Sequence, residues 1–114
     1  MNIQEIINLV DGESICLSGD SDFEVKRAFA SDLMSDVLTL NTEGLLLITG
    51  LANMQTIRTA EMAEIKNILF VRNKKPGKEM IELAREEGMN LFLCKKSMFS
   101  TCGILHQAGL NPVY

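Results

Sequence analysis

The polar residues of greatest chemical interest follow three apolar segments, over residues 45–48, 68–71 and 91–94. Short continuous apolar segments are typical of buried strands in a parallel sheet. The carboxyl ends of such strands meet at one edge, where open α/β sheets bind ligands and helix N-termini favour anions. The candidate ligand-binding residues at this edge are Thr49, Gly50, Asn53, Arg72, Lys74, Lys95 and Ser97. They predict a site for a small anion or a nucleotide phosphate, unless they are only solvated loop charges and ordinary helix caps.

A second candidate is a Ser-Asp pair that occurs twice, as Ser31-Asp32 and Ser35-Asp36. On a helix, Asp32 and Asp36 would share one face. Two carboxylates placed in this way could hold magnesium or act as acid and base. The favoured interpretation is structural: Ser31 caps the helix, and Asp32 interacts with its positive N-terminal end. Ser31 and Asp32 are nevertheless kept as candidate ligand-binding residues.

No residue is predicted to be catalytic. The phosphate-binding patterns GxxxxGK[ST] and GxGxxG are absent, so nucleotide hydrolysis and phosphate transfer are not expected. Cys94 and Cys102 are interpreted as buried, inert cysteines, and His106 as a surface or packing residue. The three cysteines form no CxxC pair, which argues against a disulfide framework or a closed zinc site. We therefore expect no enzyme activity, no metal and no cofactor.

The whole chain has the pattern of one α/β domain over residues 1–114. Strands are predicted over residues 14–17, 25–30, 45–49, 68–71 and 91–94, and helices begin near residues 2, 31, 53, 76 and 97. The alternation in the second half predicts a mostly parallel sheet with right-handed crossovers. A net charge of −4 argues against non-specific nucleic-acid binding. Neither a signal peptide nor a membrane span is recognised, so a cytoplasmic location is expected.

The apolar content suggests self-association. Apolar residues such as Met34, Met98, Phe99 and Phe29 exceed what a small core must hold. Exposed apolar patches usually mark interfaces, so a homodimer is expected.

Four segments carry a resemblance to a known family: SDLMSDVL (31–38), LLLITGLANMQTIRTAEM (45–62), ILFVRNKKPGKEMIELAREEG (68–88) and SMFSTCGILHQAGL (97–110). With this spacing the chain resembles the DRTGG-domain family, in particular the small stand-alone members found beside iron-only hydrogenase genes. The Asp-Arg-Thr-Gly-Gly string that names the family is absent, and only Thr49-Gly50 is similar to such a turn.

The resemblance implies a three-layer αβα fold like the N-terminal domain of HPr kinase/phosphorylase, without its catalytic half. It also implies a dimeric regulatory module without catalytic activity, which could bind a small anionic or nucleotide ligand at the strand-end edge. The alternative is an interaction or assembly protein for a hydrogenase or redox system, with a hydrogenase-related protein as partner and no small-molecule site.

Overall fold

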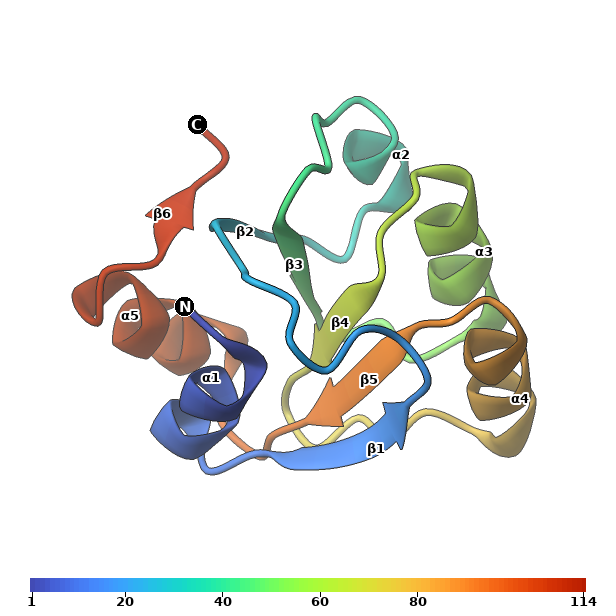
Figure 1. The fold of residues 1–114 in the computed structure, drawn as a ribbon, viewed down its shortest axis with the longest axis horizontal. Coiled ribbons are helices and arrows are strands. Elements are labelled where there is room, and N and C mark those ends of the chain that lie inside the picture. Colours follow the sequence, from blue (N-terminus) through green and yellow to red (C-terminus); the bar gives the residue numbers. More distant parts are fainter.

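A single six-stranded sheet forms the centre of the computed structural model, which describes residues 1–114 (Figure 1). The strands are β1 (Glu13–Leu17), β2 (Arg27–Ala30), β3 (Leu45–Thr49), β4 (Asn67–Phe70), β5 (Asn90–Leu93) and β6 (Asn111–Pro112). Their spatial order is β1-β5-β4-β3-β2-β6. Only β1 runs antiparallel to its neighbour, β5, so the sheet is mostly parallel as predicted.

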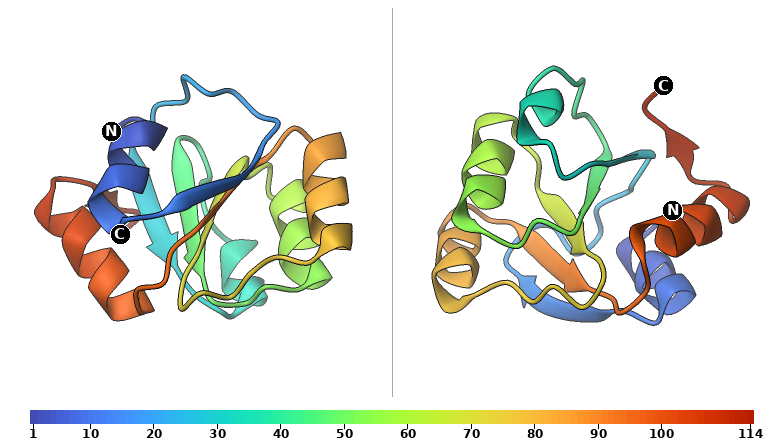
Figure 2. Two further views of the ribbon diagram at one scale, coloured as in Figure 1. Left: turned by 90° about the horizontal axis from the view of Figure 1, so that it is seen from below. Right: turned by 180° about the vertical axis from the view of Figure 1, so that it is seen from behind.

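Helices cover both faces of this sheet, which confirms the predicted three-layer αβα fold (Figures 1 and 2). They are α1 (Ile3–Val10), α2 (Met34–Val37), α3 (Met54–Met62), α4 (Lys78–Glu86) and α5 (Met98–Gln107). The helices α2, α3 and α4 pack on one face, and α1 and α5 pack on the other. None of these helices has the length and apolar character needed to span a membrane.

The apolar sequence of the central strands follows from burial on both faces. Leu45 and Leu47 of β3 point toward α2–α4, whereas Leu46 and Ile48 point toward α1 and α5. All four side chains are at most 1% exposed. Because burial of one such side chain stabilises a fold by roughly 1.5–3 kcal/mol, burial on both faces favours apolar residues at positions 45–48. The apolar residues of β4 and β5 alternate between the two faces in the same way. The five predicted strands are confirmed to within about two residues at each end, which is the usual uncertainty of strand boundaries.

The predicted helix starts near residues 53 and 97 are confirmed. The Asn53 side chain accepts a hydrogen bond from the Thr56 N–H at 3.2 Å and caps α3, and Ser97 caps α5 in the same way through Ser100 at 3.1 Å. Gly88 follows α4 with a φ of 66°, a left-handed backbone conformation that glycine adopts without a steric penalty.

The predicted helix at residues 31–38 is wrong in its start. Helix α2 begins only at Met34, its N-cap is Leu33, and no side chain caps it. Ser31 instead accepts a hydrogen bond from the Leu33 N–H at 2.9 Å, which forms a tight turn before the helix. Because Asp32 precedes the helix, Asp32 and Asp36 do not share a helix face.

Strand β6 was not predicted. It has two residues, one of which is Pro112, and it pairs with β2 only at Arg27 and Ala28. So short a segment carries no periodic pattern that sequence analysis can detect.

The predicted surplus of apolar residues is confirmed only for Phe99, which is 90% exposed on α5. Met34 is a core residue at 4% exposure, which corrects the prediction. Met98 is partly buried against the core on the α1 and α5 side, and the Phe29 ring lies 6.2 Å from the ring of Tyr114.

Candidate functional site

A group of hydrogen-bonded polar residues lies where β2, β3 and β4 end. Asp32 follows β2, Thr49 ends β3, Gly50 follows it, and Arg72 follows β4. Adjacent parallel strands bring these four residues together although they are up to 40 positions apart in sequence. We call Asp32, Thr49, Gly50 and Arg72 the strand-end cluster.

The carboxylate of Asp32 is the centre of this cluster. The Gly50 N–H donates to Asp32 Oδ1 at 2.7 Å, and the Thr49 hydroxyl donates to the same oxygen at 2.9 Å. Thr49 Oγ1 in turn accepts from the Leu51 N–H at 3.1 Å, which fixes the direction of the hydroxyl. A backbone amide and an oriented hydroxyl therefore hold one oxyanion at the end of the sheet.

Arg72 approaches the same carboxylate from β4. Its Nη2 lies 3.7 Å from Asp32 Oδ2, and both side chains are about half exposed. The guanidinium lies close over Gly50, where a Cβ atom would be 2.7 Å from Nη2. Glycine at position 50 therefore gives the guanidinium the space to reach Asp32.

The backbone of Arg72 is held in an unusual conformation. Arg72 and Asn73 have φ values of 57° and 56°, a left-handed region that costs a non-glycine residue roughly 1–2 kcal/mol. The Arg72 N–H donates to Lys96 O at 2.8 Å, and the Asn73 N–H donates to Cys94 O at 2.9 Å. These bonds fasten the turn to the end of β5 and fix the position from which the Arg72 side chain extends.

The remaining candidate residues have other roles or no visible partner. Asn53 and Ser97 cap α3 and α5, and Ser31 forms the turn that places Asp32. Lys74 and Lys95 are exposed and form no ion pair, whereas Lys96 lies 3.8 Å from Asp11. The structure thus brings together Asp32, Thr49, Gly50 and Arg72, and leaves the two candidate lysines outside the cluster.

The residues considered for catalysis or metal binding have the following surroundings. No set of three or more His, Cys, Asp or Glu residues is placed to hold a metal ion. Cys94 is buried, with its Sγ 3.4 Å from Thr101 Oγ1. Burial raises the pKa of the Cys102 thiol, which keeps it protonated near neutral pH. His106 is exposed in the last turn of α5.

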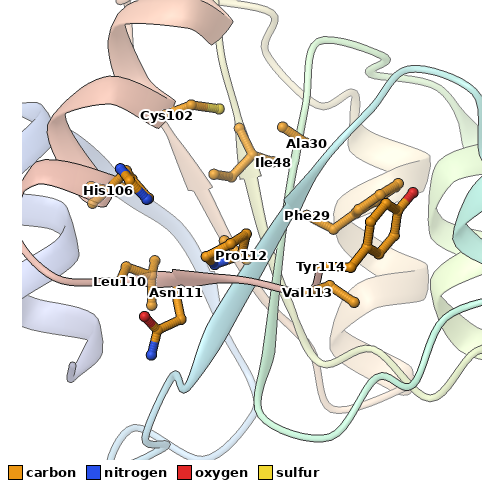
Figure 3. Close-up of a pocket in the computed structure, with 12 residues that line it drawn as sticks. Phe29, Ala30, Ile48, Cys102, His106, Leu110, Asn111, Pro112, Val113 and Tyr114 are labelled. Atoms are coloured by element: carbon orange, nitrogen blue, oxygen red, sulfur yellow. The ribbon is translucent and has the colours of Figure 1, made fainter.

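The two principal cavities do not contain the strand-end cluster. One, of about 300 Å³, lies between β2, α5 and the segment around β6, and is mainly apolar (Figure 3). The other, of about 400 Å³, is polar and lies at the opposite edge, beside Gly44 and Lys66. The apolar cavity was not predicted from the sequence, because its outer wall includes β6, which has no local sequence pattern.

No protein-family model and no curated protein matches this sequence. A search of solved structures finds a similar fold in the crystal structure of the CBS and DRTGG domains of the regulatory region of Clostridium perfringens pyrophosphatase, complexed with its activator, diadenosine tetraphosphate. The TM-score is 0.76 at 17% sequence identity. The match covers 98% of this chain and 48% of the other, so this chain spans about half the length of that neighbour. At this identity the similarity establishes the fold.

Proposed function

We propose that this protein is a regulatory module without catalytic activity, which senses a small anionic ligand such as a nucleotide at the strand-end cluster. One observation carries the proposal: Asp32 occupies a cradle made of the Gly50 amide, the Thr49 hydroxyl and the Arg72 guanidinium. These donor types also bind phosphate oxygens. In this interpretation the Asp32 carboxylate stands in for an oxygen of the ligand, which binds by displacing it.

The similarity in fold supports this assignment. The neighbouring structure is a regulatory region that binds an activating dinucleotide. By analogy, we infer that residues 1–114 form one DRTGG-like domain. The sequence resemblance is the support for the hydrogenase-associated type. Fold analogy alone does not transfer a ligand, and so the proposal depends on the cluster.

The absence of catalysis is supported by the chemistry of the candidate groups. A nucleophile needs an activating base or a lowered pKa. Burial shifts the pKa of Cys102 in the opposite direction. The one strongly organised carboxylate, Asp32, has its Oδ1 engaged by two donors rather than directed toward a reacting group.

The proposal is tested by ligand-dependent stability of the purified protein. Inorganic phosphate, pyrophosphate and adenosine monophosphate are added at millimolar concentration, and the thermal midpoint is recorded. A ligand at about 100 times its Kd stabilises the folded state by about 2.7 kcal/mol. For a domain of this size that corresponds to a shift of roughly 10–20 °C. We expect Arg72→Gln to abolish the shift.

The matched control is Lys95→Gln, which removes the same charge at the same edge outside the cluster. It should keep most of the shift, because Lys95 has no contact with the carboxylate. If none of the three probes stabilises the wild-type protein, or if both variants lose the shift equally, the proposed site is wrong.

A second candidate function is favoured by Phe99, whose side chain is 90% exposed on α5. Aromatic residues are enriched at protein–protein interfaces. It supports an interaction or assembly protein, with a second copy of this chain or a hydrogenase-related protein as partner. Affinity capture from an anaerobic host with wild-type and Phe99→Ser baits tests this. Recovery of the same proteins by both baits would exclude Phe99 as the contact.

A further inference from the structure

The apolar cavity between β2, α5 and β6 has features of a ligand pocket. Nine of its twelve lining residues are hydrophobic, and its volume is about 300 Å³. Ligand pockets range from roughly 300 to 1,000 Å³, so this cavity fits one small ring system rather than a dinucleotide. Ile48, Ala30 and Cys102 surround its inner part, as Figure 3 shows.

The polar groups and rings at the cavity indicate a flat occupant. The rings of Phe29 and Tyr114 lie 6.2 Å apart with planes inclined at 43°, and they form one end of the cavity (Figure 3). His106 and Asn111 are exposed on the other side and offer hydrogen-bonding groups at the rim. Apolar walls, aromatic rings and a few polar rim groups suit a heteroaromatic ring better than a flexible acyl chain.

Two residues that line the cavity are close in sequence to residues of the strand-end cluster. Ala30 precedes Asp32 by two residues, and Ile48 precedes Gly50 by two residues. Because two residues of fully extended chain span at most about 7 Å, the cavity wall and the cluster are separated by no more than that length of backbone. Ala30 and Ile48 are also paired in the register of β2 and β3, so both strands lead from the cavity to the cluster.

From this arrangement we propose that the cavity binds the heteroaromatic ring of a ligand whose phosphate lies at the strand-end cluster. The ligand class is then a nucleoside monophosphate or a phosphate ester of similar size. This inference rests on the proposed function for the position of the phosphate, and on the cavity alone for the ring.

Cys102 provides a direct reporter of cavity occupation. It is half buried in the cavity wall, whereas Cys16 and Cys94 are only 5% and 1% exposed. A thiol alkylating reagent at mildly alkaline pH should therefore label Cys102 first, and mass spectrometry identifies the labelled position. The rate is measured with adenosine monophosphate, adenosine, inorganic phosphate and decanoate.

We expect adenosine monophosphate to slow labelling roughly tenfold when present at about ten times its Kd. Adenosine should slow labelling only at higher concentration, and inorganic phosphate should not slow it. Tyr114→Ala, which removes an 89% exposed side chain, should weaken the protection while leaving phosphate-dependent stabilisation unchanged. Ala30→Leu, which narrows the cavity from β2, should also weaken the protection of Cys102 by adenosine monophosphate.

The outcomes distinguish the phosphate site at the strand-end cluster from the ring site in the cavity. If phosphate stabilises the protein through Arg72 but no nucleoside protects Cys102, the cavity inference is wrong and the proposed function stands. If adenosine protects Cys102 but Arg72→Gln leaves protection by adenosine monophosphate unchanged, the ring site is supported and the phosphate site is wrong. Protection by decanoate alone would overturn the ring assignment.

Discussion

Replacing Asp32 by alanine should destabilise the fold and at the same time tighten the binding of phosphate. A hydrogen bond to a charged acceptor contributes roughly 1.5–3 kcal/mol to stability. Asp32 accepts two such hydrogen bonds, but its side chain is 47% exposed, so in the variant water partly replaces Asp32 as the partner of these donors. The half-exposed ion pair with Arg72 adds less than about 1 kcal/mol. We therefore expect Asp32→Ala to lower the free energy of unfolding by about 1–2 kcal/mol.

The effect on phosphate has the opposite sign. Two like charges about 4 Å apart repel by about 1 kcal/mol in water and by about 4 kcal/mol at an effective dielectric constant near 20. Because Asp32 is half exposed, the lower part of this range applies. Removing the carboxylate should therefore raise phosphate affinity about tenfold, which corresponds to about 1.4 kcal/mol.

Denaturant unfolding measures the stability of each variant, and calorimetric titration measures its phosphate affinity. The matched control is Asp36→Ala, which removes an exposed carboxylate from α2 outside the cluster. It should change phosphate affinity by less than about threefold, since exposed charges at longer range are screened by salt. The reasoning is refuted if Asp32→Ala binds phosphate no more tightly than wild type, or if Asp36→Ala tightens binding equally.

Three further substitutions test the geometry elsewhere. Gly50→Ala should displace the Arg72 guanidinium and weaken phosphate binding about tenfold in calorimetric titration, as expected for the loss of one charge-assisted contact. The control is Gly103→Ala, whose added methyl group meets no neighbour, and it should leave phosphate binding unchanged. Asn90→Ala should lower the free energy of unfolding by roughly 2–4 kcal/mol, because it removes the hydrogen-bond partner of the Gly19 N–H and of buried Asn67. A decrease in unfolding free energy below about 1 kcal/mol, measured by denaturant unfolding, would contradict this. Phe99→Ser should shift a wild-type dimer to monomer in sedimentation velocity at tens of micromolar, and a wild-type monomer would contradict the expected self-association.

The fold was predictable where burial alone decides the residue type. Residues 45–48, 68–70 and 91–93 of β3, β4 and β5 are buried between helices on both faces, so burial favours apolar residues at these positions. Helix caps at Asn53 and Ser97 were predictable because a cap depends on neighbouring residues in the chain. Strand β6 was not predictable, because its two residues depend on contact with β2 rather than on a local pattern.

The role of Asp32 could not be obtained from local sequence. A Ser-Asp pair before an apolar segment favours a helix cap, and nothing near it in the chain indicates another partner. The partner is the Gly50 N–H, which comes within reach only because Ala30 pairs with Ile48 in the register of the sheet. A tertiary contact therefore overrode the local preference, and it moved Asp32 from a structural role to the centre of the cluster.

The strand order also determines which of the candidate cations can act on that carboxylate. Neighbouring strands lie about 4.8 Å apart, so Arg72 on β4 is two strand spacings, about 10 Å, from β2, a gap that its long side chain bridges. Lys95 follows β5, three spacings or about 14 Å from β2. That separation exceeds the screening length of about 8 Å at physiological salt, so an exposed lysine there contributes little to the potential at Asp32. Recognition of an anion at this edge should therefore depend on Arg72 far more than on Lys95, because only Arg72 reaches across β3.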